Sequence, residues 1–320
     1  MKINNIIIFF FAIFLFSSNS SEDFAFITNQ ESNKVDVINL NTKEKIKEIK
    51  VGNKPASIFI DETSNKIYIS NPESDDISVI DFFKNTQTLI KAGSSPMGLS
   101  VDINKNLLFV SNWYDNLVSV IDINKKKIIK EIKVGKSPAG IYLDQNSKRL
   151  FVANRESNNV SVINIQNLLL EKNIIVEKSP FGIYSEDYLK YIVVTNVQSN
   201  SISIIDKKDL NIISTIQVGK WPYYATHNKK KNQLYVTNQR DDSISIIDMS
   251  NNKKISSLDE ICEYPEGIDI SYTENLIVVA CWFQDNIILI DLDNFKKRKI
   301  IKTSGGPRAF GNFITSKSYE

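Results

Sequence analysis

Short apolar runs alternate with polar turns along almost the whole chain, and no stretch shows a helical period. Residues 107–111 are a continuous apolar run, which is typical of a strand buried on both faces. Residues 118–121 and 139–143 form two similar runs, and the more polar segment 127–134 suits a strand at the edge of a sheet. Because Asn, Asp and Gly dominate the intervening turns, the pattern predicts a unit of four short antiparallel strands.

This unit recurs with a period of about 42 residues. In six copies an Asn ends one apolar run, and we expect it to close the next turn by bonding its own backbone. These residues are Asn29, Asn71, Asn112, Asn154, Asn196 and Asn238, and Cys281 takes the place in the last copy. A proline keeps the same spacing, at Pro55, Pro96, Pro138, Pro180, Pro222, Pro265 and Pro307. A fixed period of this length indicates a repeat architecture.

Four strands with two apolar faces cannot bury both faces alone, and a closed ring of such sheets leaves only short, protected edges. Seven copies of 42 residues give 7 × 42 = 294 residues of the 320. The first copy lacks the Pro-led strand, and residues 307–314 supply it from the other end of the chain. We therefore predict an all-β fold, a seven-bladed β-propeller with four antiparallel strands per blade, whose ring is closed by N- and C-terminal strands that share a blade.

Two further positions fit this ring. A small serine recurs in the strand after five of the six Asn turns, where we expect it to let neighbouring sheets approach closely; it is found at Ser78, Ser119, Ser161, Ser203 and Ser245. Lysines gather in the predicted outer strands, where they protect a sheet edge against aggregation; they include Lys43, Lys45, Lys47, Lys125, Lys126, Lys127, Lys296, Lys297 and Lys299.

The repeated motif resembles the YVTN β-propeller repeat family, a WD40-like group. Residues 235–238 read Tyr-Val-Thr-Asn and residues 244–248 read Ile-Ser-Ile-Ile-Asp, with close variants at 26–29, 68–71 and 151–154. The Gly-x-x-Pro turn at Gly52, Gly93, Gly135 and Gly219 also matches. The resemblance covers residues 24–314 and implies an extracytoplasmic binding or surface protein. Related propellers include quinoprotein dehydrogenases and lactonases, so the fold alone leaves enzyme activity open.

The first residues are typical of a secretory signal peptide. Lys2 precedes an apolar segment at residues 6–16, too short to span a bilayer, and the small residues 17–20 follow it. We predict that residues 1–20 are a signal peptide cut near Ser20 or Ser21, and that residues 21–320 form one propeller domain that is periplasmic or secreted. The alternative is an uncleaved anchor.

The net charge and the histidine content exclude some kinds of binding site. The net charge is only +2, so the overall charge does not predict electrostatic attraction of the chain to nucleic acid or an anionic membrane. The chain has one histidine, His227, which excludes copper or zinc sites built from several imidazoles. We expect His227 to be a surface or turn residue, and we predict no metal site and no cofactor.

The Asn turns and the Gly-x-x-Pro turns must emerge on one face of the ring, called the top face here, because consecutive antiparallel strands alternate in direction. All three tryptophans lie in these turns, with several tyrosines and cations. We predict ligand binding there, since Trp, Tyr and Arg are enriched in binding hot spots, although the aromatic residues would serve equally as a lid over the blade ends. The predicted residues are Trp113, Tyr114, Arg155, Lys178, Lys220, Trp221, Tyr223, Arg240, Trp282 and Arg308.

The two cysteines share this face at the junction of the last two blades. Cys281 replaces the repeated Asn, and Cys262 lies three residues before Pro265, where four other copies have Gly. An oxidising compartment would allow a disulfide between them. The alternative is two buried thiols.

These observations predict a monomeric, non-enzymatic scaffold that binds a protein, a glycan or a small anionic ligand on its top face. One alternative is a propeller enzyme, either a lactonase-like hydrolase or a quinoprotein-type oxidoreductase, for which Glu266 is the best-placed carboxylate. A second is single-stranded nucleic acid binding through aromatic residues and cations, against which the small net charge argues.

Overall fold

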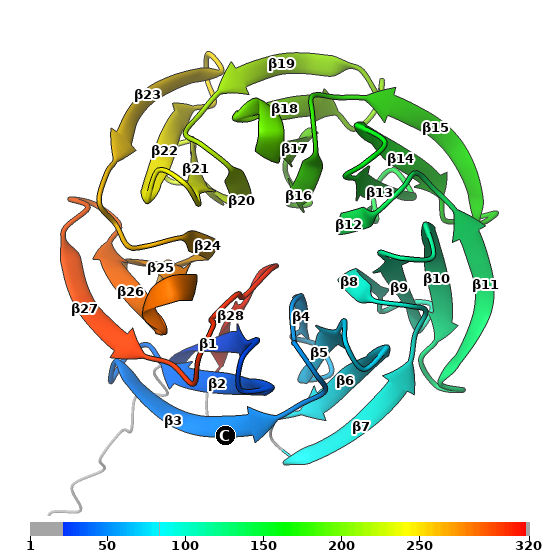
Figure 1. Ribbon diagram of the computed structural model, residues 1–320, viewed down its shortest axis with the longest axis horizontal. Coiled ribbons are helices and arrows are strands. Elements are labelled where there is room, and N and C mark those ends of the chain that lie inside the picture. Colours follow the sequence, from blue (N-terminus) through cyan, green and yellow to red (C-terminus); the bar gives the residue numbers. More distant parts are fainter. Residues whose placement is uncertain (1–21, 83, 318–320) are drawn as a thin grey trace, which may run out of the picture.

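The computed structural model describes residues 22–82 and 84–317, and these residues form seven four-stranded antiparallel sheets arranged as blades around one axis (Figure 1). The predicted seven-bladed all-β propeller is confirmed. The described residues contain two helical segments, the short 3-10 turns η1 (Val197–Ser199) and η2 (Trp282–Gln284). The predicted signal peptide, residues 1–20, lies outside the described residues.

Each blade runs from an innermost strand at the axis to an outermost strand at the rim. In that order, the strands are, for blade 1, β28 (Ile314–Lys317), β1 (Glu22–Asn29), β2 (Lys34–Asn39) and β3 (Glu44–Lys50); for blade 2, β4 (Ile58–Asp61), β5 (Lys66–Asn71), β6 (Asp76–Asp81) and β7 (Thr86–Lys91); for blade 3, β8 (Pro96–Asp102), β9 (Leu107–Asn112), β10 (Leu117–Asp122) and β11 (Lys127–Lys133); for blade 4, β12 (Pro138–Asp144), β13 (Arg149–Asn154), β14 (Asn159–Asn164) and β15 (Leu169–Ile175); for blade 5, β16 (Pro180–Tyr184), β17 (Tyr191–Asn196), β18 (Ser201–Asp206) and β19 (Ile212–Gln217); for blade 6, β20 (Pro222–Asn228), β21 (Gln233–Asn238), β22 (Ser243–Asp248) and β23 (Lys253–Leu258); and for blade 7, β24 (Pro265–Ser271), β25 (Leu276–Cys281), β26 (Asn286–Asp291) and β27 (Lys297–Lys302).

The two ends of the chain share blade 1, as predicted. Strand β28 pairs with β1 from Ala25↔Ile314 to Glu22↔Lys317, and in Figure 1 the red C-terminal strand lies beside the blue N-terminal one. The strand predicted at residues 307–314 is wrong in its position, because residues 307–313 follow an irregular path and the regular strand β28 starts only at Ile314. Within it, Phe310 forms a bridge to Ser57 of blade 2. Gly311 permits this path with a φ of 133° and a position where a Cβ would lie 2.3 Å from the Ile58 carbonyl oxygen.

The hydroxyl residue before the repeated Asn joins one blade to the next. In blade 6 the Thr237 hydroxyl donates to the main-chain carbonyl of Glu266 in blade 7 at 2.6 Å, and accepts from the main-chain N–H of Tyr224 at 3.3 Å. In four other blades the equivalent hydroxyl also donates to the following blade: Thr28 to Ala56 (2.9 Å), Ser70 to Met97 (2.7 Å), Ser111 to Ala139 (2.5 Å) and Thr195 to Tyr223 (3.0 Å). The Thr of the YVTN motif is therefore a clasp between blades.

The Asn of the motif fixes strands within its own blade. In blade 3 the Asn112 amide donates to the Ser119 hydroxyl at 2.8 Å, and blades 2, 4, 5 and 6 repeat this bond at 2.9–3.0 Å. The expectation that the Asn side chain closes the next turn through its own backbone is therefore wrong for these blades. In blade 1, where Asp36 replaces the serine, the Asn29 amide donates back to the Ile27 carbonyl of its own strand. The recurrent serine is thus a hydrogen-bond acceptor as well as a small residue.

His227 is buried, and the expectation of a surface or turn position is wrong. It lies in β20 with 5% of its surface exposed. One ring nitrogen lies 3.0 Å from the Tyr188 hydroxyl and the other 3.1 Å from the side-chain amide oxygen of Asn232. Burial lowers the pKa of His227, so the ring is held as a neutral hydrogen-bonding group.

Candidate functional site

Three positions of each repeat meet at the top face: the residues before and after the Pro and the residue after the Asn. The residue after the Pro opens the innermost strand and points side chains from different blades toward one another. Phe181 of blade 5 and Tyr223 of blade 6 have ring centroids 5.0 Å apart, and Phe310 lies 5.1 Å and 5.5 Å from them. Trp113 reaches Phe181 from blade 3 at 6.3 Å. We call Phe181, Tyr223 and Phe310 the aromatic plug.

A buried ion pair lies on this plug. The Arg308 guanidinium contacts the Glu266 carboxylate at 3.0 Å and also contacts the Tyr223 hydroxyl. The Gln239 amide donates to the other Glu266 oxygen at 2.9 Å. Burial raises the pKa of Glu266 to about 7, while Arg308, Gln239 and Tyr223 lower it in part. Since 18% of the Arg308 side chain and 3% of the Glu266 side chain remain exposed, Arg308 is the partner that still faces solvent.

A second guanidinium close to the aromatic plug, that of Arg155, makes no ion pair. Arg155 follows the repeated Asn of blade 4 and lies 5.6 Å from the centre of the Phe181 ring. It is half-buried, and among residues 22–82 and 84–317 no carboxylate pairs with it. Burial lowers the pKa of Arg155 and the positive charge of Arg308 lowers it further, while Tyr223, Tyr264 and Glu156 raise it in part. Burying a cation without a partner is costly, so this arrangement favours a bound anion.

A third guanidinium, that of Arg240, lies over blade 6. Arg240 stacks on Trp221, with its guanidinium carbon 3.5 Å from the ring centre. The charges of Arg240, Arg308 and Arg155 all lower the pKa of Tyr264, although burial raises it overall. The Tyr264 hydroxyl therefore lies in the field of three arginines, which we call the arginine mouth (Arg155, Arg240 and Arg308).

Two bulky residues hold a left-handed backbone beside this mouth. Trp221 and Tyr264 have φ of 56° and 60°. The turn requires this conformation in every blade, and the equivalent residues in blades 1 to 5 are smaller or flexible: Gly306, Lys54, Ser95, Ser137 and Ser179. A large side chain has a steric penalty at positive φ. Phe295, in the turn between β26 and β27, has the same conformation with a φ of 60°, so this conformation belongs to the turns of the repeat and does not mark the mouth.

The structure separates the predicted site residues into groups. Trp113, Arg155, Tyr223 and Arg308 meet at the axis, as described above. Trp282 lies apart from them, packed against Tyr264 and Phe283 with ring centroids at 6.2 Å and 4.7 Å.

Three predicted residues do not join the mouth. The side chain of Tyr114 is 72% exposed. Lys178 is exposed, and Lys220 forms a surface ion pair with Asp241 at 3.3 Å. Sequence reasoning missed Phe181, Phe310 and Gln239. The signal for Phe181 and Gln239 was their position, directly after the repeated Pro and the repeated Asn.

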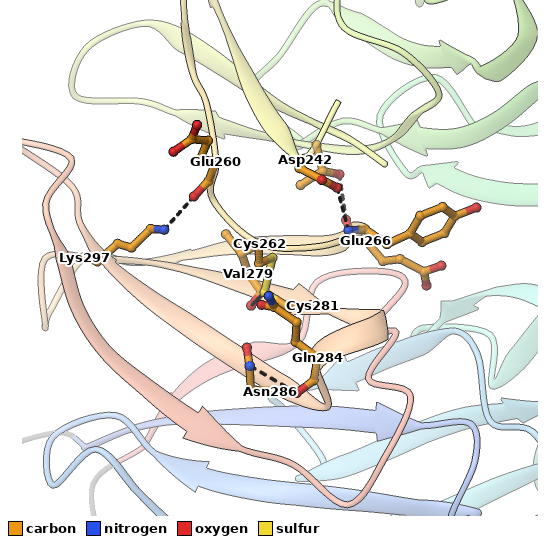
Figure 2. The surroundings of a disulfide bond; sticks show 11 residues. Asp242, Glu260, Cys262, Glu266, Val279, Cys281, Gln284, Asn286 and Lys297 are labelled. Carbon is orange, nitrogen blue, oxygen red and sulfur yellow. Dashed lines mark hydrogen bonds between the residues drawn. A yellow bond between two sulfur atoms is a disulfide. The ribbon is translucent and has the colours of Figure 1, made fainter. Parts of the chain in front are cut away.

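A disulfide joins Cys262 and Cys281 at the edge of this region, with Cα atoms 5.8 Å apart (Figure 2). Both residues are buried, with 6% and 0% of their surfaces exposed. The bond ties the linker that enters blade 7 to strand β25, two residues before Tyr264 and one residue before Trp282. It therefore anchors the turns that carry these two aromatic residues.

Neither a metal-binding cluster nor a membrane-spanning helix is found among the described residues. Within residues 22–82 and 84–317, no group of three or more His, Cys, Asp or Glu side chains is placed to hold a metal ion. Across the same ranges, no helix has the length and apolar character needed to cross a membrane.

Comparisons with known proteins bear on the fold. The model of the YNCE-like β-propeller family matches residues 24–149. No curated protein sequence gives a significant match. Among solved structures, a hydrazine synthase of Kuenenia stuttgartiensis is 18% identical, with a TM-score of 0.73 over 83% of this chain and 91% of that one. A functionally unknown protein from Desulfotomaculum acetoxidans is 13% identical, with a TM-score of 0.76 over 93% and 99%. Apo AztD from Citrobacter koseri is 14% identical, with a TM-score of 0.67 over 94% and 100%.

Proposed function

We propose that this chain, which belongs to the YVTN-like β-propellers, is a non-enzymatic binding protein that holds a small anionic ligand in the arginine mouth of its top face. The seven blades and the match to the YNCE-like family support the family. The single observation that carries the function is Arg155, a half-buried guanidinium without an acidic partner among the described residues.

The chemistry of the mouth suggests the class of ligand. Arginine binds carboxylate and phosphate groups through paired N–H donors, and partial burial strengthens such contacts. The Phe181 ring, which Arg155 contacts, is buried, and the partly exposed Trp113 packs against it and offers an apolar surface to the rest of the ligand. Glu266 offsets only Arg308, so Arg155 and Arg240 remain available to the ligand. We therefore expect an anion attached to an aromatic or other planar apolar group.

Three probes distinguish the contribution of the arginines from that of the aromatic surface: phenyl phosphate, inorganic phosphate and phenol. We expect phenyl phosphate to bind most tightly by isothermal titration calorimetry, because it alone uses both the arginines and the aromatic surface. Arg155→Gln should weaken phenyl phosphate binding by about tenfold or more, since a charge-assisted hydrogen bond is lost. Lys178→Gln is the matched control on the same face and should leave the affinity unchanged. Equal affinities for phenol and phenyl phosphate, or an unaltered Arg155→Gln variant, would contradict the proposal.

A hydrolase is the second candidate, and Glu266 favours it. A buried carboxyl whose pKa is raised to about 7 is suited to general acid–base catalysis at neutral pH. If the mouth hydrolyses a lactone, Glu266→Gln should abolish turnover of a probe such as γ-butyrolactone while the protein remains folded. Equal, background-level hydrolysis by the wild type and the variant would exclude this activity for that substrate.

Export and the nature of the partner are also proposals. The apolar segment at residues 6–16 supports cleavage near Ser20 or Ser21 and a periplasmic or secreted protein, which N-terminal sequencing of the mature protein tests directly. A protein or glycan partner would use the exposed aromatic side chains of Tyr114 and Phe283. Light scattering of the purified protein tests the expected monomer.

A further inference from the structure

A cavity of about 690 Å³ lies on the other side of the aromatic plug. The innermost strands of blades 2 to 5 and residues 310–314 line it, together with the turns that follow those strands. These turns emerge on the face opposite the arginine mouth, because each innermost strand begins at the top. Phe310 belongs both to the plug and to the lining, so the plug separates the two sites. We call this space the lower cavity.

The walls of the lower cavity are largely apolar, and the charged residues that line it are all acidic. Leu99, Ile141 and Ile183 contribute to the walls. The charged residues of the lining are Glu62, Glu186 and Asp187, and it contains no lysine or arginine. The chain as a whole is nearly balanced, with 39 basic and 37 acidic residues. A cleft lined by one sign of charge within low-dielectric walls concentrates ions of the opposite sign.

Blade 5 departs from the repeat where it meets this cavity. Six residues after the Pro, blades 2, 3, 4, 6 and 7 place a residue whose side chain caps the following turn. Asp61 accepts from the N–H of Thr63 at 2.9 Å, and Asp102, Asp144, Asn228 and Ser271 make equivalent bonds. Glu186 occupies this position in blade 5.

The Glu186 carboxylate caps no turn. It accepts from the Tyr184 hydroxyl at 3.2 Å and the Asn312 amide at 3.4 Å. Burial raises the pKa of Glu186, and neither it nor Asp187 forms an ion pair with a described residue. The buried Lys207 is paired with Asp144 of blade 4 at 3.3 Å, and its ammonium also donates to the main-chain carbonyl of Glu186 at 3.1 Å, which leaves the Glu186 carboxylate without this partner.

An unpartnered hydroxyl also lines the cavity. Tyr224 is 6% exposed, and its ring packs against Phe310 and Tyr184 with centroids at 5.3 Å and 6.3 Å. Within the described part of the chain its hydroxyl makes no hydrogen bond, although buried polar groups are normally paired. The Tyr142 hydroxyl, which also belongs to the lining, contacts Asp187 at 3.4 Å.

We infer that the lower cavity binds a protonated organic amine with an apolar body. The ammonium group lies between Glu186 and Asp187, where carboxylates accept its three N–H donors, and the apolar body packs against Leu99, Ile141 and Ile183. The Tyr224 hydroxyl remains to bond a polar atom further along the ligand. The site thus selects charge of the opposite sign to the arginine mouth.

Three probes of one shape test this selection: 4-phenylbutylamine, 4-phenylbutanol and 4-phenylbutyrate, titrated into the full chain by calorimetry. We expect the amine to bind about tenfold or more tightly than the alcohol, because of its charge-assisted hydrogen bonds. The butyrate should not displace the amine, and any heat of binding that it gives at the arginine mouth should be lost in Arg155→Gln. Equal affinity for amine and alcohol, or no binding of the amine, would overturn the inference.

Substitutions then locate the site. Glu186→Gln and Asp187→Asn should each weaken amine binding by about tenfold, whereas Glu131→Gln, an exposed carboxylate on the outer strand β11, should not. Melting curves without probe establish that each variant is folded. Arg155→Gln should leave amine affinity unaltered, and unchanged amine affinity in both acidic variants would place the amine elsewhere.

Discussion

Cys262 and Cys281 occupy in blade 7 the two positions that a glycine and the repeated asparagine occupy in blades 2, 3, 4 and 6. In blade 4 the Gly135 backbone lies so close to Asn154 that an added Cβ would be 2.7 Å from the Asn154 side chain. In blade 7 the same close approach brings two Cα atoms to 5.8 Å and lets the cysteines bond. The disulfide thus replaces a packing contact of the repeat with a covalent one.

Removing this disulfide should destabilise the fold. Cys262→Ser with Cys281→Ser opens a loop with a sequence separation of 19, and loop entropy predicts a loss of about 3 kcal/mol. Denaturant unfolding measures the loss, and reducing agent should lower the wild-type stability by a similar amount without affecting the variant. Equal stability of oxidised and reduced wild-type protein would show that the bond contributes nothing.

The repeat itself offers a way to restore blade 7. Cys262→Gly, Cys281→Asn and Ile288→Ser together rebuild the glycine, asparagine and serine of the other blades, because Ile288 stands where they have the serine. The double variant without Ile288→Ser leaves a buried Asn amide unpaired. It should therefore be less stable than the triple variant by about 1–3 kcal/mol in urea unfolding. A double variant that is more stable than the triple variant would show that the serine is not the partner that the Asn amide requires.

Stability should fall as the pH rises toward neutrality. Burial raises the pKa of Glu266 to about 7, above its ordinary value, so the folded state holds this proton more tightly than the unfolded state does. The stabilisation is complete below the unfolded pKa and is lost as the pH rises through about 7. Glu266→Gln should flatten this part of the profile, measured as melting temperature between acid and neutral pH. Asp269, whose pKa burial also raises to about 7, contributes with the same sign.

The clasp between blades 6 and 7 should be worth more than an ordinary surface contact. Thr237→Val keeps the shape of the side chain but leaves the Glu266 carbonyl and the Tyr224 N–H without their partner. We expect a loss of about 1–3 kcal/mol in the free energy of unfolding. The exposed Thr42→Val is the control and should change little. A Thr237→Val variant as stable as the wild type would refute the clasp.

Asp269 should hold the ring closed. Its carboxylate, on β24 of blade 7, accepts from the main-chain N–H groups of Phe313 and Ile314 at 2.9 Å and 3.0 Å. Asp269→Ala should raise hydrogen exchange in residues 313–317 well above that of the other innermost strands, because these donors lose their partner. Asp209→Ala, in an exposed turn, serves as the comparison. Unchanged exchange at the C-terminal strand would show that pairing with β1 suffices.

The sequence by itself determined the number of blades, the four strands of each, and the closure of the ring by both ends of the chain. It could do so because each repeat faces the same local problem of burying two apolar faces, and solves it with the same spacing of Asn and Pro. The motif residues were recognisable for the same reason, although their bonds were not. The Asn112 amide binds Ser119 across two strands, a partner that turn statistics do not reveal.

The tertiary structure alone decided which side chains meet. Phe181 and Phe310 stand far apart in the sequence, yet their ring centroids lie 5.1 Å apart because the ring brings blades 5 and 1 to a common axis. Tyr114 and Lys178 occupy turns on the same face as Arg155 but point into solvent. The burial of His227 and the acidic lower cavity have the same origin. Closure of the ring around an axis fixes these distances. The period of the sequence specifies the strands of each blade, but it does not specify which side chains of different blades meet at the axis.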